Sequence, residues 1–174
     1  MAVRRRLKLE GPGLQFLTTT VIDWIPLFRQ RFLAEAMLSQ FVETLVHFEV
    51  SCVAYCLMPS HLHAVLGFRD VAMVPKFMQS LKILSAKRLK PLIPPQLEPL
   101  FVKGGRFRLW KPRYDEFTIV SEEQFRIKLD YIHNNPVKGE MVGCSVEWPY
   151  SSAREWLGIG KGFVLIDKDL SYLG

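Results

Sequence analysis

The order of hydrophobic and polar positions predicts an α+β fold. Apolar residues at helical spacing alternate with β-rich runs bounded by Pro and Gly. Strands are predicted over residues 14–22, 49–58, 62–68 and 114–120, and helices over residues 27–47 and 73–89. This order is that of the ferredoxin-like βαββαβ fold, in which one four-stranded antiparallel sheet carries two helices on one face.

A third helix is predicted after the last strand. Ser121 at its N-cap and Gln124 three residues later form a capping box, and Glu122 and Glu123 favour the first turn through the helix dipole. Pro136 is expected to end this helix. A helix beyond the βαββαβ unit must lie beside or across the sheet.

Composition predicts a single folded domain of 174 residues, with 49% hydrophobic and 12% aromatic residues. We expect a basic N-terminal arm over residues 1–13, a domain over residues 14–158 that includes the aromatic-rich stretch VEWPYSSAREWLG, and a C-terminal tail over residues 159–174. The chain has three cysteines and no apolar run of the roughly 18 residues that span a membrane. These features predict a cytoplasmic protein that does not enter the membrane.

Positive charge is concentrated in one part of the chain. The net charge is +6, but the segment from Lys76 to Arg113 holds ten basic residues and one acid, so the remainder carries a net −3. Such a block is either a solvated surface or a binding site for a polyanion such as DNA. The DNA-binding candidates are Lys82, Lys87, Arg88, Lys90, Arg106, Arg108, Lys111 and Arg113, with Phe107 and Trp110 interleaved as stacking or core residues.

Two histidines stand on one side of the predicted third strand. Within YCLMPSHLHAVLGF, alternation places Leu62 and its partners on the face toward the two helices, and His61 and His63 on the opposite face. Two imidazoles at positions i and i+2 of a strand can reach one ion, although packed histidines are commoner than ligands at such positions. The pattern thus allows a metal site without requiring one.

The third helix carries polar groups beside its apolar stripe. Phe125, Leu129 and Ile132 are predicted to face the core, while Tyr131 and Asn135 lie one turn apart along a neighbouring stripe. A helical tyrosine is usually a packing residue, and an asparagine before proline usually ends a helix. A functional interpretation requires that these residues meet the two histidines in space.

Several segments together resemble the single-tyrosine HUH transposases, in particular the REP-associated tyrosine transposases. The segments are YCLMPSHLHAVL, RYDEF, LDYIHNNPVKGEMV and WPYSS, and they span about residues 16–156. The resemblance implies that Tyr131 is the catalytic nucleophile and that His61, His63 and Asn135 bind a divalent cation, Mg²⁺ or Mn²⁺. Because Pro136 is expected to distort the helix at Asn135, Asp115, Glu116 and, more remotely, Glu49 are alternative third ligands.

The resemblance also implies an activity and a partner. Single-stranded or hairpin DNA would be cleaved and rejoined through a 5′-phosphotyrosine intermediate, by a monomer or a homodimer. Two other functions stay open at this point: a non-catalytic DNA-binding module or domesticated regulator with the same fold, and a metal-dependent phosphodiesterase that acts through water.

Overall fold

The computed structural model describes residues 10–173, so residues 1–9 of the predicted basic arm lie outside the described residues. The main strands are β1 (Gly13–Thr20), β2 (Ser51–Met58), β3 (His61–Phe68) and β6 (Asp115–Ile119), and the helices are α1 (Arg31–Phe48), α2 (Val74–Leu89), α3 (Glu122–Lys138) and the short α4 (Ala153–Trp156). A separate hairpin is formed by β4 (Val102–Lys103) and β5 (Arg106–Phe107).

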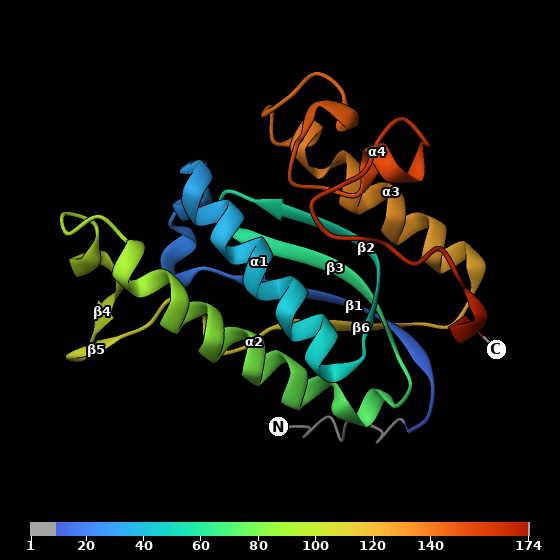
Figure 1. Cartoon of the computed structure of the whole chain (residues 1–174), viewed down its shortest axis with the longest axis horizontal. Coiled ribbons are helices and arrows are strands. Elements are labelled where there is room, and N and C mark those ends of the chain that lie inside the picture. Colours follow the sequence, from blue (N-terminus) through green and yellow to red (C-terminus); the bar gives the residue numbers. More distant parts are fainter. Residues whose placement is uncertain (1–9, 174) are drawn as a thin grey trace, which may run out of the picture.

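The four main strands form one antiparallel sheet in the order β2-β3-β1-β6. Helices α1 and α2 lie together over one face of this sheet, whereas α3 lies on the other side (Figure 1). The predicted ferredoxin-like fold is therefore confirmed, and α3 adds a third layer to it.

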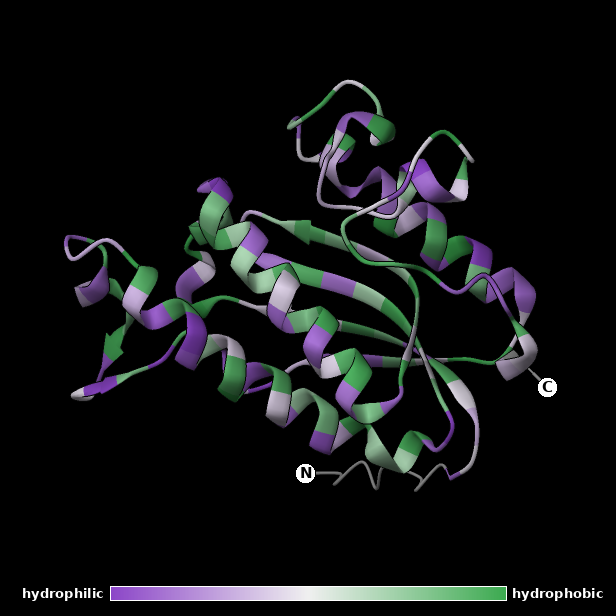
Figure 2. Cartoon of the chain, in the orientation of Figure 1, coloured by the Kyte–Doolittle hydropathy of each residue, from purple (hydrophilic) through white to green (hydrophobic). Residues whose placement is uncertain are grey.

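Strand alternation divides the hydrophobic core between the two faces. Leu62, Ala64 and Leu66 of β3 pack toward α1 and α2, while Val65 packs on the opposite face. Helices α1 and α2 alternate hydrophobic and hydrophilic residues along their length, as expected for helices that cover a sheet on one side (Figure 2). Each buried leucine or phenylalanine contributes about 1.5–3 kcal/mol of transfer free energy, so both faces stabilise the sheet.

Helix α3 begins as predicted but does not end at its proline. The Ser121 hydroxyl accepts a hydrogen bond from the Gln124 backbone N–H at 3.2 Å, which confirms the predicted N-cap. The prediction that Pro136 ends the helix is wrong, because helical structure continues to Lys138. Proline removes only its own N–H bond, and the backbone recovers at once, with the Gly139 N–H donating to the Asn135 carbonyl at 2.9 Å. Asn135 thus keeps its helical position one turn after Tyr131.

The aromatic-rich segment over residues 146–158 packs on the rest of the domain. Its backbone follows the outer edge of β2, where the Ser152 N–H donates to the Tyr55 carbonyl at 3.0 Å. The indole N–H of Trp148 donates to the Leu57 carbonyl at 3.0 Å, and that of Trp156 donates to the Val53 carbonyl at 2.8 Å. This segment covers an edge that would otherwise expose unpaired backbone groups.

Residues after 158 also pack on the domain. Val164 is buried in the core beneath α1 and α2, and the Tyr55 hydroxyl accepts hydrogen bonds from the Phe163 and Val164 N–H groups at 2.8 and 3.2 Å. The ring of Tyr172 lies against Gly67, where any side chain would collide with it. The predicted tail is thus in contact with β2 and β3.

Two local features complete this description of the fold. Helix α1 begins at Arg31 rather than at residue 27, because Gln30 is extended and residues 27–29 form a separate 3-10 turn. The pair Gly104-Gly105 forms the tip of the β4–β5 hairpin with φ values of 58° and 71°, which glycine adopts without strain. Among the described residues, no helix is long and apolar enough to cross a membrane.

Candidate functional site

The register of the sheet assembles one half of the candidate site. His63 of β3 lies opposite Thr18 of β1, and Thr18 in turn lies opposite Asp115 of β6. Paired residues of antiparallel strands point to the same face, so these three side chains form a row across the sheet on the side away from α1 and α2. His61, two residues before His63, lies on the same face, and the two imidazole ring centroids are 4.6 Å apart.

Helix α3 supplies the other half of the site. The ring centroid of Tyr131 is 5.3 Å from that of His63, and Phe16 packs against both rings. One turn later, the Asn135 amide nitrogen Nδ2 is 3.3 Å from Nε2 of His63. His61, His63, Tyr131 and Asn135 all line one open pocket between the sheet and α3. The four residues come from segments about 70 positions apart, and the structure brings them together.

Burial keeps both histidines neutral at physiological pH. Desolvation lowers the pKa of His61 from its ordinary value to about 4. It lowers the pKa of His63 to about 3, and the neighbouring His61 and Lys128 contribute further to this shift. A neutral imidazole has the lone pair that metal coordination requires.

A hydrogen bond fixes the orientation of the His63 ring. Its Nδ1 lies 2.7 Å from the Thr18 hydroxyl, and both residues are buried. If Nδ1 carries the proton and donates to Thr18, the lone pair of Nε2 points toward Asn135. Such a second bond on a ligand imidazole is the usual arrangement in metal sites.

The donor set fits a divalent cation through two imidazoles and an amide. Because the oxygen and nitrogen of an amide can exchange places by a flip, Asn135 can present its oxygen to the same point that Nε2 of His63 faces. Residues 10–173 hold no group of three or more His, Cys, Asp and Glu that could bind a metal ion. Of the alternative third ligands, Asp115 lines the pocket. The next residue, Glu116, points to the opposite face of the sheet, and Glu49 forms an ion pair with Arg69 at the end of α1.

Several residues of the pocket had no distinctive signal in the sequence. Lys128 lies one turn before Tyr131, and its ammonium sits 4.6 Å from the ring centroids of both Phe16 and Phe117. Trp24 and Thr18 also line the pocket. Helical spacing from Tyr131 could have suggested Lys128, whereas Thr18 and Trp24 depend on pairings between distant parts of the chain.

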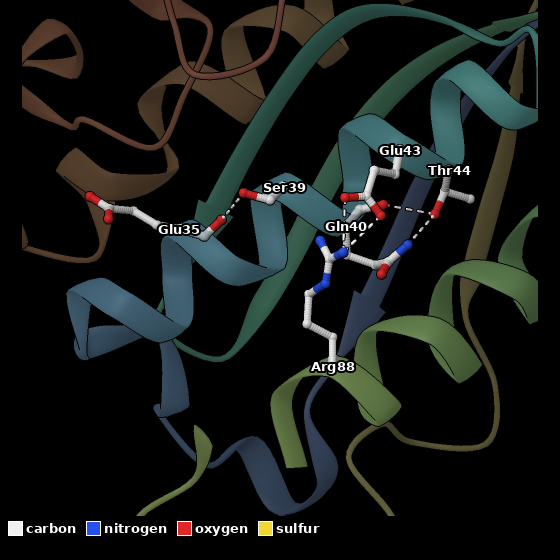
Figure 3. A network of polar contacts seen from close by, with 6 residues as sticks. All are labelled: Glu35, Ser39, Gln40, Glu43, Thr44 and Arg88. Atoms are coloured by element: carbon white, nitrogen blue, oxygen red, sulfur yellow. Dashed lines mark hydrogen bonds and ion pairs between the residues drawn. The ribbon is translucent and has the colours of Figure 1, made fainter. Parts of the chain in front are cut away.

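The predicted DNA-binding residues are dispersed over the surface. Lys111 and Arg113 line the pocket, whereas Lys87, Arg88, Lys90, Arg106 and Arg108 do not. The guanidinium of Arg88 binds both carboxylate oxygens of Glu43 on α1 at 2.8 Å (Figure 3). The ammonium of Lys90 lies over the half-buried ring of Phe107. The basic residues that form one block in the sequence therefore occupy two separate regions of the structure, one at the pocket and one away from it.

Two members of the basic segment have structural contacts. Lys82 is half-buried, and its ammonium donates hydrogen bonds to the backbone carbonyls of Lys111, Pro112 and Arg113 at 2.5, 3.1 and 3.4 Å. It supports the chain segment that forms one wall of the pocket. Trp110 is buried, and its indole N–H donates to Ser85 at 2.9 Å, so the base-stacking interpretation is wrong for this residue.

Comparisons with known proteins agree with this arrangement. Residues 21–135 match the family model described as IS200-like transposase. A candidate REP-associated tyrosine transposase of Haemophilus influenzae is 26% identical over 143 residues, which cover 80% of this chain and 79% of that protein. The REP-associated tyrosine transposase of Escherichia coli K12 is 33% identical over 63 residues, about a third of each chain (36% and 37%).

Two solved structures share the fold. A REP-associated tyrosine transposase bound to a REP hairpin superposes with a TM-score of 0.66 and 20% identity, over 99% of this chain and 96% of that one. A candidate transposase of Deinococcus radiodurans gives a TM-score of 0.51 and 24% identity, over 77% of this chain and 97% of that one. Since the family model covers more than half of the chain, this protein belongs to the IS200-like transposase family.

Proposed function

We propose that this protein cleaves and rejoins single-stranded DNA through a covalent bond between Tyr131 and a 5′ phosphate. The observation that carries the proposal is the pocket in which Tyr131 faces an amide and two neutral imidazoles, those of the buried His63 and the half-buried His61. A non-catalytic binding module would not need a half-exposed tyrosine beside two oriented imidazoles. Membership of a transposase family supports a DNA substrate.

The chemistry is a transesterification at phosphorus. The Tyr131 oxygen forms a bond to the phosphorus, the bond to the 3′ oxygen breaks, and the proton lost by the phenol is balanced by the one that the departing 3′ oxygen gains. A phosphodiester bond is exchanged for a phosphotyrosine bond, so a later 3′-hydroxyl can reverse the reaction and join strands without ATP. Phe16, which packs against both Tyr131 and His63, helps to orient the phenol toward the histidines.

His61, His63 and Asn135 would hold Mg²⁺ or Mn²⁺. When bound, this cation would withdraw negative charge from the scissile phosphate. Thr18 would hold His63 in the tautomer that presents Nε2 to the pocket, and Asp115 could supply a carboxylate at the same site. All of these residues come from one copy of the chain, so the proposed chemistry needs no second subunit.

The proposed substrate is a DNA hairpin with a single-stranded flank. A structural neighbour of the same fold was solved bound to a REP hairpin. Lys111, Arg113 and Lys128 surround the candidate site and could neutralise phosphates of the flank. The more distant Lys87, Arg106 and Arg108 are exposed on α2 and near the β4–β5 hairpin, where they could contact a stem.

A denaturing gel tests this function. The protein would be incubated with labelled palindromic repeats taken from the DNA that flanks its own gene, with Mn²⁺ or with EDTA. We expect a covalent adduct that requires the cation and is lost in Tyr131→Phe. Tyr114 lines the same pocket and offers a second hydroxyl, so Tyr114→Phe is the matched control and should retain the adduct.

The alternatives give different results on the same gel. Cleavage without an adduct that persists in Tyr131→Phe would indicate a phosphodiesterase that uses water. Salt-sensitive binding with no cleavage, unchanged by EDTA and by His63→Ala, would indicate a binding module or regulator.

A further inference from the structure

Trp24 combines solvent exposure with an unusual backbone conformation. It follows β1, has a φ of 57°, and comes directly after Asp23, whose φ is 51°. The left-handed region is unfavourable for a bulky side chain and persists only where surrounding structure imposes it. Even so, 57% of Trp24 remains exposed to solvent. The fold therefore holds an indole at the surface in an unfavourable backbone conformation, and burial of the side chain does not compensate for it.

Neighbouring segments fix this conformation. The Trp24 N–H donates to the Val21 carbonyl at 3.1 Å, and the Asp23 carboxylate pairs with Lys103 of β4 at 2.6 Å. The end of β1 is joined to the segment before β6, where the Ile22 N–H donates to the Leu109 carbonyl at 2.8 Å. These contacts hold the backbone before and at Trp24 in place, and they thereby fix where the indole lies.

The indole lies at the edge of the candidate active site. Its ring centroid is 5.6 Å from that of His61, with the two rings nearly perpendicular, and Trp24 lines the same pocket as Tyr131. The ammonium of Lys111 lies 4.2 Å from the indole centroid. An exposed aromatic surface, a phosphate-binding cation and the proposed scissile phosphate would therefore be neighbours.

We propose that Trp24 is a stacking platform for one unpaired nucleobase next to the scissile phosphate. Aromatic side chains interleaved with cations bind single strands in this way, because every base has a flat face while its phosphate requires a positive charge. Lys111 would then contact the phosphate of the stacked nucleotide. The role is one of positioning, since Trp24 touches the substrate and not the reacting atoms. The placement beside the scissile phosphate rests on the proposed function, whereas the stacking itself does not.

A binding experiment isolates the base from the backbone. In a Tyr131→Phe background, which prevents covalent capture, the affinity for the oligothymidine dT12 would be compared with that for an abasic 12-mer with the same phosphates. Trp24→Asn is the informative variant, because asparagine tolerates the left-handed conformation but has no ring. We expect it to weaken dT12 binding by about 5- to 150-fold, the range measured for base–aromatic stacking, without changing abasic binding. Trp24→Phe should restore most of the difference.

Fluorescence provides a readout that a purely structural role would not change. Of the four tryptophans, Trp110 and Trp148 are buried and Trp156 is partly buried, so dT12 should quench mainly the emission of Trp24. The abasic oligonucleotide should quench much less, and Trp24→Phe should remove the dT12 effect. Phe163→Ala, which removes an exposed aromatic outside the pocket, is the matched control and should change neither measurement.

The outcomes separate this inference from the proposed function. If Trp24→Asn lowers dT12 and abasic affinity equally, or lowers neither, the stacking platform is refuted. If stacking is observed but wild-type protein forms no adduct with any hairpin DNA, the proposed function fails while the nucleobase site stands. Both together would support a platform beside the cleavage point.

Discussion

The hydrogen bond between Thr18 and His63 allows a sharp test of how the site is organised. The replacement Thr18→Val keeps the shape of the side chain and removes the hydroxyl that lies 2.7 Å from Nδ1 of His63. Thr18 is 8% exposed and His63 is 4% exposed, so water cannot readily replace the lost partner. The variant therefore leaves a buried polar nitrogen without its hydrogen bond.

The size of the effect follows from this burial. An unsatisfied buried donor costs about 1–3 kcal/mol of folding free energy. Loss of the partner that orients a ligand imidazole typically lowers metal affinity by about 10- to 100-fold. The nucleophile Tyr131 and the proposed ligands His61 and Asn135 are unchanged in this variant. The maximal rate of adduct formation at saturating Mn²⁺ should therefore fall much less than the affinity for Mn²⁺.

Two measurements check this prediction. Electron paramagnetic resonance gives the free Mn²⁺ concentration and thus the affinity, and urea denaturation gives the free energy of unfolding. Thr118→Val is the matched control, since its hydroxyl donates to Gln15 at 3.2 Å on the other face of the sheet and should not affect Mn²⁺. Unchanged Mn²⁺ affinity in Thr18→Val, with the protein folded, would refute the assignment of His63 as an oriented ligand.

Three further predictions concern other parts of the site and its support. Asn135→Ala should weaken Mn²⁺ binding, while Asn135→Asp should strengthen it by adding a charged oxygen ligand, and isothermal titration calorimetry checks both. Burial lowers the pKa of His133 to about 4 in the folded protein. In the unfolded chain this histidine is protonated already below about pH 6.5, so the free energy of unfolding decreases as the pH falls from about 6.5 toward 4. His61 and His63 contribute to the same decline, so His133→Gln should make it less steep in urea denaturation without abolishing it. A decline as steep as that of the wild type would contradict a lowered pKa for His133. Lys82→Gln should speed hydrogen exchange at the backbone amides of Lys111 and Arg113, whereas Lys87→Gln should not, and equal exchange in both variants would contradict a structural role for Lys82.

The fold and the central residues of the site could be predicted because they depend on local patterns. Period-two alternation placed His61 and His63 on the face away from α1 and α2, and helical spacing placed Tyr131 and Asn135 one turn apart. The resemblance to a known family then predicted that the two pairs meet. The structure brings the four side chains to one pocket, while their roles in catalysis and metal binding stay predictions.

The remaining features depend on contacts between distant segments. The register between β1 and β3 selects Thr18 as the partner of His63, and no pattern within either strand fixes that register. The position of Trp24 depends on how the end of β1 pairs with residues 109–111. Likewise, charge counted along the chain did not reveal that Lys82 binds backbone carbonyls or that Arg88 pairs with Glu43.

Intact-mass and peptide mass spectrometry of the protein–DNA adduct tests the central claim most directly. After incubation with the hairpin repeat and Mn²⁺, the protein should gain the mass of the DNA fragment 3′ to the cut. Proteolysis and nuclease digestion should then leave a nucleotide on the peptide that contains Tyr131. A modified peptide that contains Tyr114 and not Tyr131 would contradict the account. So would efficient, cation-dependent cleavage with no mass gain at any time point.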